Sequence, residues 1–335
     1  MNLKWNPDRN IESKSLHSQG DSKDLHQPLH HLRDTSELKL MQSFSLDQIE
    51  LLREAIRFGV NAPEITIKKE DAVGLNLMLN EIDPSELNLH FSFEEGAVLV
   101  HVLYHLEEAL RNRGKLTDRM SGSLRWGNRP PFRDLDREIS ELLPGFKFNF
   151  FKSSDKIDDY SRVDQLTQIF VPLLKSMENT DLSVKDFLKK SIFRIYAGND
   201  FVSELAKIRA FHKIWALVLD ELNLKPFPPD LELSLAQSAY EKNIYHNFIR
   251  SAAAALNFTV GGVRRIHFSG IEVDPEGKVE NPESFGNRIN ANIFHMLTHE
   301  SHMDKVIDPA AGSFTIESLS DEMAEKAWSK ITAKV

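Results

Sequence analysis

Residues 192–222 carry the pattern that decides the fold: Ile192-Phe193-Arg194-Ile195-Tyr196-Ala197 is a β-prone run, and helical sequence follows it from Glu204 to Leu222. In the helical part, apolar residues recur three, four or seven positions apart, which places them in one stripe. They are Leu205, Ile208, Trp215, Val218 and Leu222. The same spacing predicts that Lys207, Arg209 and Lys213 take the outer face of the helix.

Seven further β-prone runs repeat this arrangement, each followed by helical sequence. The eight runs are residues 38–43, 64–68, 87–92, 122–126, 146–151, 192–197, 231–237 and 265–270. Eight parallel strands alternating with helices close most naturally into a (β/α)8 TIM barrel of about 250 residues plus extensions. The predicted fold class is α/β, with the barrel over residues 36–335. Residues 1–35 are polar and predict an extended N-terminal arm.

Composition excludes several classes of protein. The chain of 335 residues is 41% hydrophobic and 27% charged, and no apolar run approaches the ~20 residues that cross a bilayer. The first residues lack the apolar segment of a signal peptide, and the absence of cysteine excludes disulfides and thiolate zinc sites. We therefore expect a cytoplasmic protein. The net charge of -9 repels nucleic acid, so no nucleic-acid partner is expected.

The C-terminal end carries the most distinctive motifs. His299-Glu300-Ser301-His302 leads through Asp308-Pro309-Ala310-Ala311-Gly312-Ser313 into residues 317–328. Earlier come Asn199-Asp200-Phe201, residues 204–210 and Trp215, in the same order and at a similar separation as in the substrate barrel of methylmalonyl-CoA mutases. The chain resembles that family strongly over residues 191–330 and more weakly over residues 36–190. Within this segment Asp200 is expected to cap a helix.

The resemblance also shows what an active mutase would need. In that family a carboxy-terminal module binds adenosylcobalamin through Asp-x-His-x-x-Gly, whereas this sequence stops at Val335, so no cobalamin-binding domain is expected. The nearest string, residues 24–29, lacks the glycine. Active barrels further carry Ser-Gly-Tyr-His at the fifth strand and a tyrosine before the first strand. The matching residues, 148–155 and 30–37, contain no tyrosine, and 148–155 contain no histidine.

Bulky strand residues give a separate physical argument. An acyl-CoA thioester threaded along a barrel axis requires small, polar inward positions. The strands instead carry Phe91, Phe93, Phe146, Phe148, Phe150, Phe151, Ile192, Phe193, Ile195, Tyr196, Ile266 and Phe268. Because side chains alternate between the two faces of a strand, a good share of these should point inward. We therefore predict a filled barrel that does not bind acyl-CoA.

Two other patterns suggest binding sites. His295, His299 and His302 could meet on one helix face as a metal site, but their order is not that of zinc proteases, and the end-of-barrel resemblance accounts for them. The pair Gly261-Gly262 precedes two arginines and could cradle phosphate, yet it lies before a strand rather than after one. We interpret it as a tight helix-to-strand connection.

The remaining titratable residues sit near the predicted carboxyl ends of strands, where barrel enzymes place their sites. They are Glu94, Glu95, Lys152, Asp200, Tyr240 and Glu272. No pair among them forms a recognisable acid–base or nucleophilic arrangement. We expect no catalytic, cofactor-binding or metal-binding residue in this chain. At the C-terminus, Ser320 is predicted to cap a helix that covers the last strand, with Met323, Ala327, Trp328 and Ile331 buried.

The resemblance, together with the missing family motifs, implies the small, non-catalytic subunit of a methylmalonyl-CoA mutase, or a truncated relative of it. The resemblance implies a heterodimer in which a large catalytic subunit holds adenosylcobalamin and interconverts methylmalonyl-CoA and succinyl-CoA. The alternative is the substrate-binding barrel of an active split acyl-CoA mutase, an isomerase whose cobalamin module is on another chain. A free-standing acyl-CoA-binding barrel needs the same open channel. Whether the sequence is a fragment or a shorter paralogue stays open.

Overall fold

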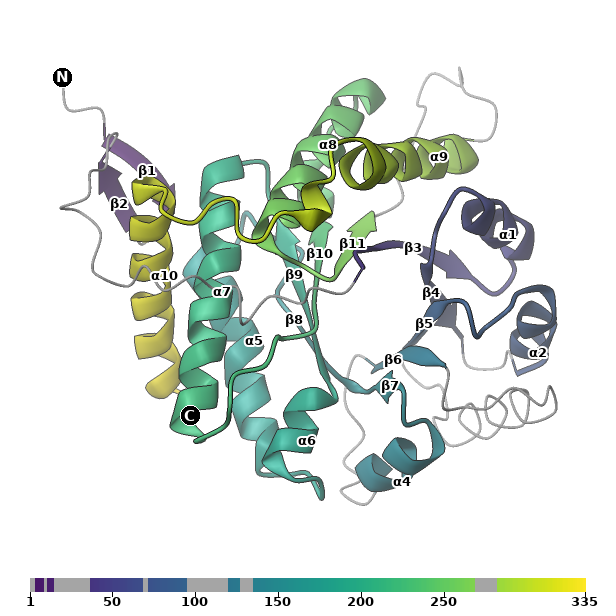
Figure 1. Cartoon of the computed structure of the whole chain (residues 1–335), viewed down its shortest axis with the longest axis horizontal. Coiled ribbons are helices and arrows are strands. Elements are labelled where there is room, and N and C mark those ends of the chain that lie inside the picture. Colours follow the sequence, from purple (N-terminus) through teal and green to yellow (C-terminus); the bar gives the residue numbers. More distant parts are fainter. Residues whose placement is uncertain are drawn as a thin grey trace.

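The computed structural model describes residues 4–8, 11–14, 37–68, 72–94, 120–126, 135–268 and 282–335. Nine parallel strands form a nearly closed barrel, in the order β7-β6-β5-β4-β3-β11-β10-β9-β8 (Figure 1). They are β3 (Lys39–Ser45), β4 (Ala62–Ile67), β5 (Asn88–Phe93), β6 (Ser121–Trp126), β7 (Phe146–Lys147), β8 (Asn149–Lys152), β9 (Ser191–Ala197), β10 (Leu231–Leu235) and β11 (Arg265–Phe268). Each of the eight predicted runs contains strand, and the predicted α/β TIM barrel is confirmed.

The fifth predicted run is divided in two, and this division closes the ring. β7 pairs with β6, whereas β8 pairs with β9, and only Phe148 separates β7 from β8. The backbone N–H groups of Phe148 and Asn149 both donate to the carbonyl of Lys190, at 3.1 Å each. The two ends of the strand order are therefore consecutive in the chain.

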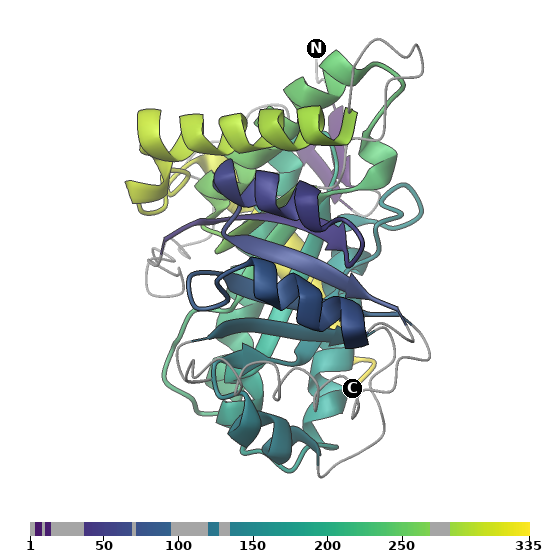
Figure 2. The same ribbon diagram turned by 90° about the vertical axis from the view of Figure 1, so that its right-hand side faces the viewer.

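Helices surround the strands (Figures 1 and 2). They are α1 (Ile49–Arg57), α2 (Ala72–Glu81), α4 (Leu135–Leu142), α5 (Arg162–Met177), α6 (Val184–Lys189), α7 (Phe201–Glu221), α8 (Ile244–Gly261), α9 (Pro282–His295) and α10 (Phe314–Thr332). α8 ends at a left-handed Gly262 with φ of 75°, three residues before β11. The predicted tight connection at Gly261-Gly262 is confirmed.

Most apolar strand residues pack outward against these helices, whereas Phe150 of β8 lies inward against Arg125 and Arg194. Phe193 of β9 is fully buried, and its ring contacts those of Phe170 on α5 and Phe211 and Trp215 on α7, with centroids 5.3–6.5 Å apart. Phe91, Phe146, Phe148, Phe151, Ile195, Ile266 and Phe268 belong to the same buried apolar cluster. The inward placement that the sequence suggested for these residues is wrong, because the helices cover the outer face of the sheet and draw the apolar residues there.

Three expectations about α7 and α10 are also wrong. Lys207 and Arg209 are buried, 0% and 2% exposed, rather than lying on an outer face. α10 packs on α7 and α5 instead of on the last strand, and so covers the far side of α7. The N-cap residue of α10 is Ser313, while Ser320 lies within the helix and donates to the carbonyl of Glu317 at 2.8 Å.

The buried stripe of α10 is otherwise as predicted. Met323, Ala327 and Ile331 are buried, and Trp328 is half-buried against the core. Near the N-terminus, β1 (Lys4–Asp8) and β2 (Ile11–Lys14) form an antiparallel pair, and β2 contacts α10. The rest of the predicted arm lies outside the described residues. Within the described ranges, no helix has both the length and the apolar character needed to span a bilayer.

Candidate functional site

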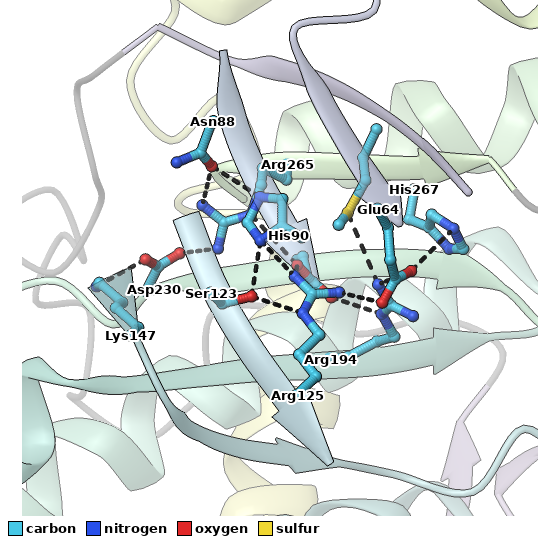
Figure 3. A network of polar contacts seen from close by, with 12 residues as sticks. Glu64, Asn88, His90, Ser123, Arg125, Lys147, Arg194, Asp230, Arg265 and His267 are labelled. Atoms are coloured by element: carbon cyan, nitrogen blue, oxygen red, sulfur yellow. Dashed lines mark hydrogen bonds and ion pairs between the residues drawn. The ribbon is translucent and has the colours of Figure 1, made fainter. Parts of the chain in front are cut away.

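Charged and polar side chains occupy the interior of the barrel (Figure 3). The strand sequences explain this, because Glu232 alternates with Leu231 and Leu233, and Arg265 precedes Ile266. With the apolar residues facing the helices, alternation turns their polar neighbours inward. We call the resulting set the barrel network: Glu64, Asn88, His90, Ser123, Arg125, Lys147, Arg194, Asp230, Glu232, Arg265 and His267.

Two glutamates and two arginines form the centre of the barrel network. Arg125 donates from Nη1 to Oε1 of Glu64 at 2.7 Å and from Nη2 to Oε2 of Glu232 at 2.8 Å. Arg194 donates from Nη2 to Oε2 of Glu64 at 2.9 Å and from Nε to Oε1 of Glu232 at 2.5 Å. Every carboxylate oxygen therefore has a charged partner, which is the condition under which buried ions are tolerated.

A second group extends the barrel network toward the amino ends of the strands. Arg265 donates from Nη2 to Oδ1 of Asp230 and from Nε to Oε2 of Glu232, the latter at 3.2 Å. Lys147 pairs with the other carboxylate oxygen of Asp230 at 2.6 Å. Asp230 thus joins β11 to β7 across the end of β10.

Three arginines and three carboxylates balance one another in this interior. Glu64, Arg125, Arg194, Asp230, Glu232 and Arg265 are each 6% exposed or less. Burial acts to raise the pKa of Glu64, but Arg194 and Arg125 outweigh it and hold that pKa well below its ordinary value. The pKa of Glu232 is lowered in the same way, with burial opposed by Arg125, Arg194 and Arg265. Both carboxylates are therefore ionised and make poor general bases.

His90 is fully buried and neutral. Its Nδ1 lies 2.8 Å from Nη2 of Arg125 and 2.7 Å from the hydroxyl of Ser123, which itself accepts from Nε of Arg125. Since an arginine can only donate, Nδ1 accepts and Nε2 carries the proton, which it donates to Oδ1 of Asn88 at 2.8 Å. Burial and the nearby arginines hold the pKa of His90 well below its ordinary value.

His267 lies against two serines. The hydroxyl of Ser43 donates to Oε2 of Glu64 at 3.0 Å and so accepts from Nε2 of His267 at 2.8 Å, while the Ser234 hydroxyl donates to Nδ1 at 3.0 Å. Burial, with the neighbouring Arg194, lowers the pKa of His267 to about 3. Because His267 donates toward Ser43, it does not activate this serine as a nucleophile.

The barrel histidines bear on the cofactor that the family resemblance implies. Both ring nitrogens of His90 are bonded within the barrel network, and those of His267 are bonded to Ser43 and Ser234, so neither ring presents a nitrogen to a metal such as cobalt. Asp24 and His26, the residues nearest to the family motif, lie outside the described residues. The described barrel residues do not fit an adenosylcobalamin ligand set.

The titratable residues singled out from the sequence lie apart from the barrel network. Asp200 caps α7, since its carboxylate accepts from the backbone N–H of Ser203 at 3.2 Å, as predicted. Glu94 and Lys152 are exposed, and burial raises the pKa of Tyr240. Glu95 and Glu272 fall outside the described residues. In the described structure no hydrogen bond or ion pair joins any two of these residues.

The three C-terminal histidines also do not converge on a metal position. His295 bonds through Nε2 to the carbonyl oxygen of Phe58 at 2.7 Å, and its ring stacks on that of His299 with centroids 5.2 Å apart. His302 follows the helical segment in a left-handed conformation, with φ of 50°. In the part of the chain that the structure describes, no group of three or more potential ligands of this kind is found.

Sequence reasoning missed the barrel network entirely. The missed residues include Glu64, Arg125, Arg194, Glu232 and Arg265, none of which belongs to a known motif. A usable signal was present: in β9, β10 and β11, single charged residues alternate with aliphatic or aromatic ones. In a barrel whose outer face is covered by helices, that alternation assigns the charges to the interior.

Comparison with known proteins supports the resemblance. Residues 171–334 match the family model described as methylmalonyl-CoA mutase. A methylmalonyl-CoA mutase from Rhizobium meliloti is 33% identical over 159 residues, covering 45% of this chain and 21% of that protein. A probable methylmalonyl-CoA mutase small subunit from Mycobacterium bovis is 31% identical over 167 residues, covering 49% of this chain and 27% of that protein. A methylmalonyl-CoA mutase large subunit from Propionibacterium freudenreichii subsp. shermanii is 28% identical over 165 residues, covering 48% of this chain and 22% of that protein.

These matches are partial on both sides. The chain aligns with 21% to 27% of the length of these relatives, and the family model covers α10 and the described elements back into α5. Among solved structures, a dihydropteroate synthase from Thermus thermophilus aligns with 79% of this chain and 95% of its own at 13% identity, with a TM-score of 0.41. That likeness is too distant to bear on function.

Proposed function

Because residues 171–334 match the methylmalonyl-CoA mutase family, we propose that this chain is the small, non-catalytic subunit of a methylmalonyl-CoA mutase. In this proposal a large subunit binds adenosylcobalamin and interconverts methylmalonyl-CoA and succinyl-CoA. The present chain binds no cofactor, and the heterodimer is cytoplasmic. Relatives named as small and as large subunits support a multi-subunit enzyme.

One observation carries the non-catalytic assignment. Glu64 on β4 and Arg194 on β9 belong to opposite strands of the ring, because four strand steps separate them in either direction once β7 and β8 count as one strand. Their side chains nevertheless meet, with Oε2 and Nη2 2.9 Å apart. An ion pair therefore crosses the interior where a threaded substrate would pass.

Displacing that pair would be unfavourable. Separating a buried ion pair leaves desolvated charges without partners, which is typically destabilising by about 3–5 kcal/mol. Arg125 and Glu232 cross the same level, so more than one pair would have to open. The sequence argument for a filled barrel thus stands with largely different side chains, since ionic groups fill the centre together with Phe150, whose ring centroid lies 4.9 Å from Arg125 and 5.5 Å from Arg194.

One observation favours the alternative, an active split acyl-CoA mutase. Ser43 points into the barrel network from β3 and is nevertheless exposed, while Thr66 and Ser92 near the ends of β4 and β5 are half-buried. Small polar residues therefore line the carboxyl side of the barrel above the ion pairs. A substrate that stopped at this level would not need to cross Glu64 and Arg194.

Isothermal titration distinguishes the two functions. The purified chain is titrated with methylmalonyl-CoA and succinyl-CoA, first alone and then with the large subunit of the same organism. No binding to the chain alone, with complex formation and mutase activity only when the large subunit is present, is expected. Micromolar binding to the isolated chain would instead support the split active enzyme.

A further inference from the structure

The barrel ring has one junction where neighbouring strands are not joined by a ladder. All six residues of β6 pair with β5, but on the other side of β6 only Gly122 and Ser123 have partners, in β7. All four residues of β8 pair with β9. β6 and β8 nevertheless lie close together. In the described part of the chain, residues 124–126 of β6 and residues 149–152 of β8 thus adjoin without ladder hydrogen bonds, and we call this junction the seam.

At the amino end of the same junction, β7 is firmly held. The ammonium group of Lys190 donates to the carbonyl oxygens of Pro144 and Phe146, at 2.7 and 3.2 Å. Lys147 pairs with Asp230 of the facing strand end at 2.6 Å. Together with the ladder between β6 and β7, these contacts fix the amino end of the junction. The weakly joined part is therefore the seam, at the carboxyl end.

Side chains bridge the seam where the backbone does not. The guanidinium group of Arg125 on β6 lies over the ring of Phe150 on β8, with Cζ 4.9 Å from the ring centroid. Arg194 of β9 lies over the same ring at 5.5 Å. Arg125 is fixed in this position by its ion pairs with Glu64 and Glu232. A cation–π contact is one weak interaction, whereas a ladder supplies a series of hydrogen bonds.

We infer that the barrel opens locally at the seam, and that the contact between Arg125 and Phe150 keeps the seam closed. Local opening requires the least free energy where the fewest backbone hydrogen bonds must break. Opening here separates β6 from β8 while the ladders elsewhere in the ring stay intact, and it admits water to Arg125 and the ion pairs behind it. No partner or substrate takes part in this motion, so it is independent of the proposed function.

Native-state hydrogen exchange, measured by NMR on the whole chain, tests this inference. The backbone N–H of Gly122 donates to the carbonyl of Gly145, on the β7 side, so the N–H groups of Ser123 and Arg125 face β5 by alternation. These two amides report the opening of β6 itself, because they do not point into the seam. After correction for intrinsic rates, they should exchange at least about fivefold faster than the amides of β4, which has ladders on both sides.

Two adjacent phenylalanines of β8 provide a matched pair of variants. Phe150→Leu removes the ring that lies against Arg125, whereas Phe151→Leu makes the same change to a ring that packs outward on Phe193. Phe150→Leu should raise exchange at Ser123 and Arg125 at least about threefold more than in β4. Phe151→Leu should raise exchange at these two amides no more than it does in β4. Circular dichroism checks that both variants are folded.

Two outcomes would overturn the inference. Equal exchange of the Ser123, Arg125 and β4 amides in the unmodified chain would mean that the seam is no weaker than a ladder. Faster exchange that both variants change to the same extent would mean that Phe150 is not the residue that keeps the seam closed. If Phe150→Leu does not fold, the comparison within the unmodified chain decides.

Discussion

Arg125 on β6 and Glu232 on β10 lie 107 residues apart in the chain, and their side chains form an ion pair of 2.8 Å inside the barrel, 1% and 0% exposed. Glu232 also accepts from Arg194 and Arg265, so one carboxylate holds three guanidinium groups. The pair is therefore part of a connected set in which each carboxylate neutralises more than one cation.

Replacing Glu232 by glutamine should strongly destabilise the fold. Three buried arginines would then face two carboxylates, and breaking a buried ionic set in this way costs about 3–5 kcal/mol. Urea unfolding followed by circular dichroism measures the loss. The matched control is Glu322→Gln, whose partner Lys326 is one turn away on the surface of α10 at 2.9 Å. This exposed pair should contribute less than about 1 kcal/mol, and equal losses for the two variants would contradict the role given to the barrel network.

Stability should fall as the pH drops below neutrality. His267 has a pKa of about 3 in the folded state and 6.5 as the ordinary value, and the pKa of His90 is also lowered. A base with a lowered folded-state pKa binds more protons when unfolded, so its contribution is present above pH 6.5 and is lost as the pH falls below it. Each histidine adds a slope of up to about 1.4 kcal/mol per pH unit.

Below about pH 4.5 the carboxylates add to the same trend. The pKa values of Glu64, Asp230 and Glu232 are lowered in the folded state, so their contribution is present above the ordinary values and is lost on acidification. Urea unfolding at pH 7.5, 6.0 and 5.0 tests the histidine part alone. His267→Asn should flatten the slope between these points, and a free energy of unfolding that is constant from pH 7.5 to 5.0 would refute the prediction.

Removing the N-terminal cap of α7 should lower the free energy of unfolding moderately. Asp200→Ala takes away the carboxylate that accepts from the Ser203 backbone and hydroxyl, and loss of such a cap typically costs about 1 kcal/mol. Asp200→Asn keeps an acceptor at the same place and should cost a few tenths of a kcal/mol. Thermal unfolding of the two variants makes the comparison. A loss that is the same for both would assign the effect to the charge, through Arg162, rather than to the cap.

Arg209 should stabilise the folded conformation of the segment that precedes α10. Arg209→Met removes the arginine that pairs with both Asp308 and Glu317, while Glu317 keeps its ion pair with Lys213, and we expect a loss of about 3 kcal/mol. Hydrogen exchange should rise first in residues 302–313. Arg53→Met, which removes a half-exposed arginine from Glu50 and Glu81, is the control and should leave exchange in that segment unchanged. Uniform exchange across the molecule in the Arg209 variant would argue against a local role.

Much of the architecture could be predicted from local sequence patterns. All eight strand runs, the cap at Asp200 and the turn at Gly262 depend on neighbouring residues, and local spacing reports them well. The break at Phe148 could not be foreseen, because it follows from closing the ring between β6 and β9. The direction of each strand relative to its neighbours likewise depends on pairing between residues that are distant in the sequence.

The errors share one physical origin. Which face of a strand or helix is buried depends on elements far away in the chain, and the sequence was interpreted as though large apolar residues must fill the barrel. Arg209 looked like a surface residue because its partners Asp308 and Glu317 come about a hundred residues later. Lys207 looked like one because its partners Gln165 and Tyr196 lie on α5 and β9. Buried charge is recognisable only once its partners are known.

The position of α10 also has a consequence for how the barrel is made in the cell. Arg209 and Lys213 belong to α7, whereas their partners Asp308, Glu317 and Asp321 follow 99 to 108 residues later. At ~5–20 residues per second, a ribosome needs roughly 5–20 s to synthesise that stretch. Until it emerges, the two cations stay hydrated and this side of α7 stays open. Covering of α7 is thus a late event, and a nascent chain interrupted before residue 308 displays an unfinished surface to chaperones.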